Sequence, residues 1–305
     1  MSAESRSGDR LSGVQVVLQL PYHLDESIDF ETLGREIDHV FCAGADGLVI
    51  AMVTEVLRLS ESERHELAEF CCESAGDRGP VVVSVGSEST RVSCELALQA
   101  ERVGASAVMA IPPLSVGVDE AQLCDYYERI LQSVGVPLIV QDASGYVGRP
   151  MSIELQAGLL DRFGAQRVLF KPEADPIGPR LTALHSATGG RALVFEGSAG
   201  IALLDSYRRG VVGTMPGADL VEALVAFWRA LEAGDWSRAT EISEPLTSLV
   251  MLESSLDSFV AVEKHILLRQ GVFVNEVIRG PVGFVLDRET RAEVDRRYDR
   301  LMSVL

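Results

Sequence analysis

Two lysines stand out among the residues of this chain that could do chemistry. The 305 residues include 27 basic side chains, of which two, Lys171 and Lys264, are lysines and the other 25 are arginines. An arginine guanidinium stays protonated, whereas a desolvated lysine ammonium can lose its proton near neutral pH and attack a carbonyl carbon. Lys171 ends the apolar run Val168–Phe170, which indicates imine chemistry there. The alternative is that codon usage explains the low lysine content and that Lys171 is an ordinary loop residue.

Other groups suited to proton transfer or hydrogen bonding follow short apolar runs. The carboxyl groups could act as general acids or bases, or they could accept hydrogen bonds at helix starts and in loops. The hydroxyl groups could donate to a substrate carboxylate or cap helices, and the phenol could relay a proton or pack on a rim. In contrast, we expect Lys264 to be a solvated or salt-bridged residue on a helix face. The carboxyl, hydroxyl and phenol groups belong to Glu55, Asp142, Glu173, Glu196, Thr54, Ser198 and Tyr146.

The cysteines and histidines show no spacing typical of a metal site. We therefore predict no metal and no cofactor. We expect buried, reduced thiols, since the cysteines other than Cys42 fall inside helical patterns. Five cysteines make an odd number, which argues against a complete set of disulfides. The residues are Cys42, Cys71, Cys72, Cys94, Cys124, His23, His39, His65, His185 and His265.

Charge and hydropathy exclude two classes of partner. The formal net charge of −18 argues against nucleic-acid binding, because phosphate contacts need a basic surface. No apolar stretch approaches the roughly 18 to 20 residues that span a bilayer. Met1–Gly13 is polar and lacks the apolar core of a signal peptide, so we expect a disordered leader over 1–12 and a cytoplasmic protein that acts on a small molecule.

Short apolar runs alternate with longer amphipathic stretches through most of the chain, as expected for parallel strands buried on both faces. Eight such units favour a closed (β/α)8 TIM barrel over 13–233, and no GxGxxG follows the first strand. Beyond it the pattern predicts a helical C-terminal extension over 234–305. The expected strands are Val14–Leu20, Gly47–Ala51, Val81–Val85, Ala107–Ile111, Pro137–Gln141, Arg167–Lys171, Ala192–Glu196 and Val211–Thr214. The expected helices include Asp29–Ala43, Glu61–Ala75, Thr90–Val103, Asp119–Ser133, Ser152–Phe163, Ala199–Arg209, Leu220–Ala233, Ser237–Ser254, Leu256–Gln270 and Arg288–Val304.

Active sites of such barrels lie at the carboxyl ends of the strands. Lys171 closes the sixth expected strand, so its amine should project into the mouth of the barrel. This placement favours a nucleophile over an ordinary loop residue.

Several segments resemble the dihydrodipicolinate synthase / N-acetylneuraminate lyase superfamily of Schiff-base aldolases over nearly the whole chain. The resemblance implies that Lys171 forms the imine, that Gly197 and Met215 flank a bound keto acid, and that the helical tail supports a homotetramer. The segments that carry it are Gly86-Ser87-Glu88-Ser89-Thr90, Gly104-Ala105-Ser106-Ala107, Phe170-Lys171-Pro172-Glu173, Glu196-Gly197 and Gly213-Thr214-Met215.

The chain departs from this family where substrate carboxylates and protons are handled. Two hydroxyl donors of the carboxylate-binding loop are replaced in Ala51–Glu55, which leaves backbone N–H groups near Val53 and Thr54. The usual Tyr-Asn of the fifth strand is Gln141-Asp142, so Gln141 would orient the imine or a water molecule. The arginine that binds a second carboxylate falls at Tyr146. Glu173, Tyr146 or a water molecule would then move the protons.

These features resemble the branch that acts on 2-keto-3-deoxy sugar acids. We expect a lyase, either a dehydratase or an aldolase, that uses a lysine imine. The first alternative is 4-hydroxy-tetrahydrodipicolinate synthase, which condenses pyruvate with aspartate semialdehyde. The second is a barrel that binds a keto acid without turnover.

Overall fold

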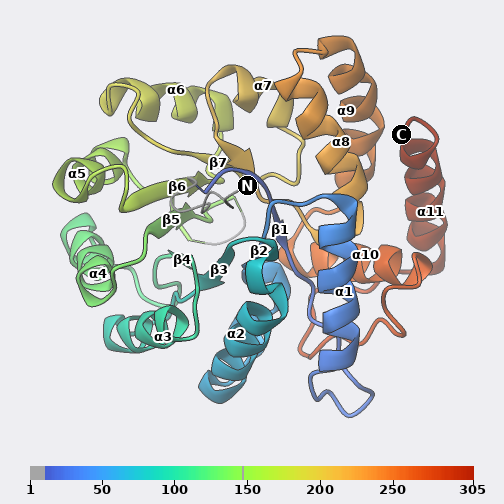
Figure 1. Ribbon diagram of the computed structural model, residues 1–305, viewed down its shortest axis with the longest axis horizontal. Coiled ribbons are helices and arrows are strands. Elements are labelled where there is room, and N and C mark those ends of the chain that lie inside the picture. The colour runs from blue at the N-terminus through green and yellow to red at the C-terminus, as the bar shows by residue number, and fades with distance from the viewer. Residues whose placement is uncertain (1–10, 146–147) are drawn as a thin grey trace, which may run out of the picture.

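The computed structural model describes residues 11–145 and 148–305, which form a closed barrel of parallel strands surrounded by helices (Figure 1). Neighbouring strands follow the order β6-β5-β4-β3-β2-β1-β8-β7. The ring is closed between its two ends by a parallel bridge from Phe170 to Val194 and by a 2.9 Å hydrogen bond from the Phe170 N–H to the Leu193 carbonyl. The strands are β1 Gly13–Val17, β2 Gly47–Ile50, β3 Val81–Ser84, β4 Ala107–Ala110, β5 Leu138–Asp142, β6 Val168–Pro172, β7 Phe195–Glu196 and β8 Gly213–Thr214. The predicted (β/α)8 TIM barrel is confirmed.

Helices connect the successive strands and cover the outside of the barrel (Figure 1). A capping box starts α2, with the Ser60 hydroxyl accepting from the Glu63 N–H and the Glu63 carboxylate accepting from the Ser60 N–H. Asp119 caps α4 by accepting from the Gln122 N–H at 2.8 Å. The helices are α1 Phe30–Ala43, α2 Glu61–Ala75, α3 Thr90–Arg102, α4 Glu120–Ser133, α5 Ile153–Phe163, α6 Ile177–Ala187, α7 Leu203–Arg208 and α8 Val221–Glu232.

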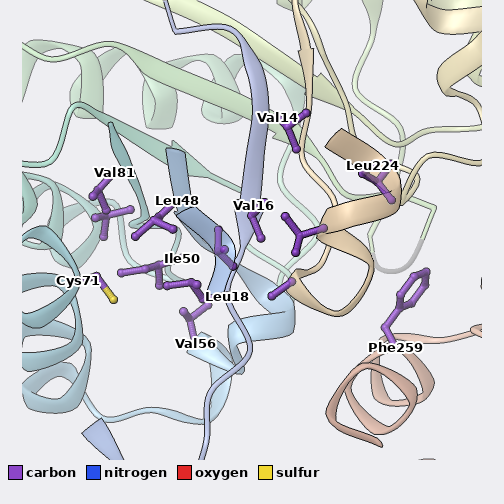
Figure 2. Close-up of a cluster of buried hydrophobic side chains, with 14 of the residues drawn as sticks. Val14, Val16, Leu18, Leu48, Ile50, Val56, Cys71, Val81, Leu224 and Phe259 are labelled. Atoms are coloured by element: carbon purple, nitrogen blue, oxygen red, sulfur yellow. The ribbon is translucent and has the colours of Figure 1, made fainter. Parts of the chain in front are cut away.

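Alternate residues of strands β1 to β6 pack into two separate apolar clusters. One cluster fills the barrel interior and includes Val17, Val49 and Leu169. The other lies between strands and helices, where Figure 2 shows Val16 of β1 and Ile50 of β2 among its members. Because both faces of the strands are covered, their sequences are almost continuously apolar.

Three further helices, α9 Trp236–Val250, α10 Leu256–Arg269 and α11 Arg288–Met302, gather on one side of the barrel (Figure 1). Helix α9 packs on α8, and α11 packs on α9. Helix α10 contacts two short 3-10 turns, η1 Met52–Thr54 and η4 Ala218–Leu220, which lie just after strands β2 and β8. The extension therefore reaches the carboxyl-terminal end of the barrel. The proposed division at residue 233 stays an interpretation.

The structure differs from the sequence-based expectations in three places. Strands β7 and β8 contain two residues each, which is shorter than expected. Helix α6 was not among the expected helices, and its first turn contains Gly178 and Pro179, which weaken the helical signal. Lys264 is salt-bridged but not solvated, because its side chain is fully buried.

The described cysteines are all free thiols, as predicted, but they are less buried than expected. Cys42 is exposed and Cys71 is buried, whereas Cys72, Cys94 and Cys124 are half-buried. Among the helices of the described residues, none is long and apolar enough to cross a membrane.

Candidate active site

A pocket opens at the carboxyl-terminal end of the barrel and contains the predicted nucleophile. It holds about 440 Å³ of empty space, counting the part that is open to solvent. Most of its wall is apolar, and its ionisable groups among the described residues are Lys171, Glu173 and Glu263. The lining residues are Val17, Ala51, Met52, Val53, Gln141, Lys171, Glu173, Gly197, Ala199, Met215, Gly217, Leu256, Phe259 and Glu263.

Lys171 reaches this pocket because of its position on β6. Leu169 belongs to the cluster inside the barrel and Phe170 to the cluster outside it, so the alternation of a strand turns Lys171 inward again. Its side chain is 5 % exposed, and Nζ lies 2.9 Å from Glu173 Oε1. Lys171 is therefore an amine shielded from bulk water at the mouth of the barrel.

Glu173 connects the amine to the neighbouring strand. Its Oε2 accepts a 2.6 Å hydrogen bond from Gln141 Nε2, and Gln141 pairs with Lys171 in the β5–β6 register. Burial raises the pKa of the Glu173 carboxyl, while the charge of Lys171 and the hydrogen bonds from Gln141 and Lys171 oppose that shift. The Oε1 atom of Gln141 is buried without a hydrogen-bond partner among the described residues. The three side chains form a connected group that can exchange protons and still accept a hydrogen bond from a ligand.

The lack of a side chain at Gly197 leaves space for the side chains of Lys171 and Glu173. A Cβ atom at this position would lie 2.8 Å from Lys171 Cε and 2.9 Å from Glu173 Cγ, distances that real Cβ contacts do not tolerate. Met215 and Val53 also line the pocket. Three residues expected at the substrate, Gly197, Met215 and Val53, thus lie around the same space as Lys171.

Thr54 occupies a different place from its neighbour Val53. It is fully buried and is not among the residues that line the pocket. Its hydroxyl accepts a 2.9 Å hydrogen bond from the Ala51 N–H, and its own N–H donates to the Ala51 carbonyl at 3.1 Å. Thr54 therefore fixes the turn that presents Val53.

Three of the other strand-end groups hold loops in place. Asp142 accepts from the Met151 N–H at 3.0 Å, and Glu196 accepts from the Ser198 N–H and the Thr214 hydroxyl, each at 2.7 Å. These contacts support the interpretation of Asp142, Glu196 and Ser198 as loop and cap groups.

Glu55 pairs with the second lysine of the chain. Lys264 Nζ lies 2.5 Å from Glu55 Oε1 and 2.7 Å from the Val277 carbonyl, and it stands 4.7 Å from the centroid of the Tyr22 ring. Burial lowers the pKa of Lys264, and the Glu55 carboxylate opposes that shift. Lys264 is thus committed to a buried ion pair away from the pocket lining.

Sequence reasoning did not identify the contribution of α10, which brings Leu256, Phe259 and Glu263 to the pocket. The sequence did contain a sign of burial, because Glu263, Lys264 and His265 interrupt an otherwise apolar helix from Phe259 to Leu268. Charged residues in such a helix are buried with it and need partners or a function. Tyr146 lies outside the described residues.

The donor groups of the described pocket suit an organic substrate better than a metal ion. Across residues 11–145 and 148–305, no group of three or more His, Cys, Asp or Glu side chains is arranged to hold a metal. The reactive group that the pocket does present is the buried amine.

Comparison with known proteins extends this description over the whole chain. The Dihydrodipicolinate synthetase family matches residues 10–299. An L-2-keto-3-deoxyarabonate dehydratase of Azospirillum brasilense is 28 % identical over 310 residues, covering 98 % of each chain. The 4-hydroxy-tetrahydrodipicolinate synthase 2 of Streptomyces coelicolor is 29 % identical over 246 residues, covering 76 % of this chain and 77 % of its own.

A solved structure shares the fold. A prophage protein of the dihydrodipicolinic acid synthase family from Escherichia coli K12, in complex with pyruvate, superposes with a TM-score of 0.86 at 22 % identity, covering 96 % of this chain and 99 % of its own. The family's enzymes are lyases that join a lysine to small keto acids as a Schiff base. The chain belongs to the Dihydrodipicolinate synthetase family and is a lyase of this lysine-imine type.

Proposed function

We propose that this enzyme dehydrates a 2-keto-3-deoxy sugar acid and that Lys171 forms the imine. The observation that carries the proposal is the buried group of Lys171, Glu173 and Gln141 in one pocket, linked by contacts of 2.9 and 2.6 Å. The match to a named 2-keto-3-deoxyarabonate dehydratase over 98 % of both chains supports the substrate class.

The chemistry begins with the Lys171 amine attacking the C2 ketone, whose oxygen leaves as water. The resulting iminium withdraws electrons and makes the C3 protons acidic. Glu173 is the base that takes a C3 proton, since its carboxyl group is already in contact with the amine and burial raises its pKa toward the range useful for proton transfer. The free Oε1 of Gln141 accepts a hydrogen bond from the hydroxyl of the intermediate that precedes the imine.

Substrate binding uses backbone groups and small residues. The Val53 N–H would hold the C1 carboxylate on the turn that Thr54 stabilises. Gly197 leaves space beside the amine, and Met215 provides an apolar wall. A substrate can approach the amine because the neighbouring residue, Gly197, has no side chain next to Lys171 Cε.

The second candidate is 4-hydroxy-tetrahydrodipicolinate synthase, the activity named for the Streptomyces coelicolor relative. Its second substrate, aspartate semialdehyde, brings an additional carboxylate. Among the described residues, the pocket lining contains two carboxyl groups, Glu173 and Glu263, and no arginine. This arrangement disfavours a second substrate carboxylate, because the described lining offers no arginine to pair with it.

Turnover measurements distinguish these functions. The enzyme is offered a panel of 2-keto-3-deoxy pentonates and hexonates, and separately pyruvate with aspartate semialdehyde, and the products are identified by mass spectrometry. The proposal expects one water lost from a sugar acid. Cleavage to pyruvate and an aldehyde would show an aldolase, condensation would show a synthase, and an adduct without product would show a binding protein.

Assembly as a homotetramer, which rests on family resemblance, and location in the cytoplasm, which rests on composition and hydropathy, stay predictions. Sedimentation at several protein concentrations tests the first of them.

A further inference from the structure

The C-terminal extension contributes a carboxyl group to the pocket. Glu263 of α10 lines the same space as Lys171 and is 3 % exposed. Leu256 and Phe259 from the same helix line the pocket beside it. A carboxyl group held this way, on a helix far from β6 in the chain, is a second acid-base group in the pocket lining.

The described residues leave the hydrogen-bonding capacity of the Glu263 carboxyl group partly unused. Its Oε2 atom is buried with no hydrogen-bond partner among the described residues. Its Oε1 atom lies over Gly217, where a Cβ atom would collide with it and would also stand 2.8 Å from Asp219 Oδ1. Gly217 thus makes room for the carboxyl group at the end of β8. A buried polar group without a partner is costly to keep, which argues for a partner that arrives with the substrate.

The charged groups facing Glu263 are mostly carboxyl groups. Asp219 of η4, Glu253 before α10 and Glu36 of α1 surround it, and Lys171 of β6 is the basic group that acts on it. Lys264 is engaged by Glu55. Burial raises the pKa of Glu263 well above its usual value, with Asp219 and Glu36 adding to the shift and Lys171 opposing it. Burial and the neighbouring carboxyl groups therefore favour the protonated form of Glu263, which can donate a hydrogen bond.

Glu173 and Glu263 are suited to different carbons of a keto acid held at C2. Glu173 is in contact with the amine that holds C2, so it is placed for the adjacent C3. Glu263 lines the pocket without contacting that amine. A 2-keto-3-deoxy acid presents its C4 hydroxyl one carbon further out, where a neutral carboxyl group can hydrogen-bond to it.

We propose that Glu263 is the general acid that protonates the departing C4 hydroxyl, an assignment that rests on the proposed dehydratase function. After C3 loses its proton, the enamine electrons form the C3–C4 double bond and regenerate the iminium. The C4–O bond breaks with its electron pair on oxygen, which takes the proton of Glu263 and leaves as water. Glu173 then returns a proton to solvent, and Glu263 takes one from solvent.

The E263Q variant tests the assignment, since glutamine keeps the size and a hydrogen-bond donor but has no acid proton. General acid catalysis contributes about 100-fold to 10,000-fold, so kcat on the sugar acid should fall by at least about 100-fold. Borohydride trapping of pyruvate at Lys171 should be unchanged. A 4-fluoro analogue, whose leaving group needs little protonation, should be turned over by E263Q at close to the wild-type rate.

The E253Q variant is the matched control. Glu253 belongs to the same buried carboxyl group cluster, and burial raises its pKa as well, but it does not line the pocket. It should retain the wild-type kcat. Wild-type kcat in E263Q, or an equal loss on the hydroxy and fluoro substrates, would overturn the assignment. If the wild type traps pyruvate but dehydrates no sugar acid, the dehydratase function itself fails, and the role of Glu263 fails with it.

Discussion

At the scale of single residues, the reactivity of Lys171 depends on what lies within a few ångströms of it. Glu173 Oε1 is 2.9 Å from the amine, and Gln141 holds the other oxygen of that carboxyl group. This arrangement fixes the position of the amine and keeps a proton acceptor beside it. Effective catalysis depends on such placement, and a displacement of about 1 Å can cost about 100-fold in rate.

Replacing Gly197 by alanine tests this placement. The new Cβ atom would lie 2.8 Å from Lys171 Cε and 2.9 Å from Glu173 Cγ, so both side chains must move. We expect kcat/KM of G197A to fall by about 10-fold to 100-fold, as measured in the turnover assay.

Gly158 offers a matched control within the described chain. It lies inside α5 and a Cβ atom there would meet nothing within 4 Å. G158A should keep full activity and gain about 0.5–1 kcal/mol of unfolding free energy, because alanine favours a helix interior. Full activity in G197A would show that the room beside the amine is not needed.

Sequence patterns at this scale identified the amine but not all of its surroundings. Lys171, Glu173 and Gln141 follow strand ends that the apolar runs mark, so they could be predicted to meet at one end of the barrel. Glu263 could not, because no local pattern tells which barrel end a C-terminal helix contacts. The same docking explains why Lys264, expected on a solvated or salt-bridged helix face, is buried.

At the scale of elements, α10 ties the extension to the turn after β2. Its Lys264 pairs with Glu55, and both side chains are fully buried. Glu55 follows η1, and it adopts a left-handed backbone with φ of 57°, a conformation that is uncommon for a residue other than glycine. The ion pair therefore helps hold the turn that carries Val53.

Removing one partner of this pair should destabilise the fold strongly. K264M removes the 2.5 Å partner of the buried Glu55 carboxylate, which keeps the longer contact of 3.5 Å with Arg58. We expect a loss of about 3–5 kcal/mol in unfolding free energy, measured by urea denaturation. The double variant E55Q/K264M should lose clearly less than K264M alone. A double variant whose loss equals the sum of the two single losses would contradict a direct pairing.

At the scale of the whole molecule, the barrel could be predicted because its strands are buried on both faces and recur with regular spacing. All eight expected strands overlap observed ones. The shortness of β7 and β8 could not be predicted, because hydrogen bonding around a closed ring sets where a strand ends. The architecture separates the two lysines of the chain, because Lys171 lines the pocket and Lys264 is held in a buried ion pair. A keto acid in the pocket can therefore react with only one of them.

Trapping the imine in the intact protein tests the central claim most directly. The enzyme is incubated with pyruvate and borohydride, and the modified peptide is located by mass spectrometry after digestion with a glutamate-specific protease. The account predicts a single reduced adduct on Lys171, none on Lys264, and none in K171A. An unmodified Lys171 after incubation with pyruvate and each 2-keto-3-deoxy acid, or turnover that survives K171A, would contradict it.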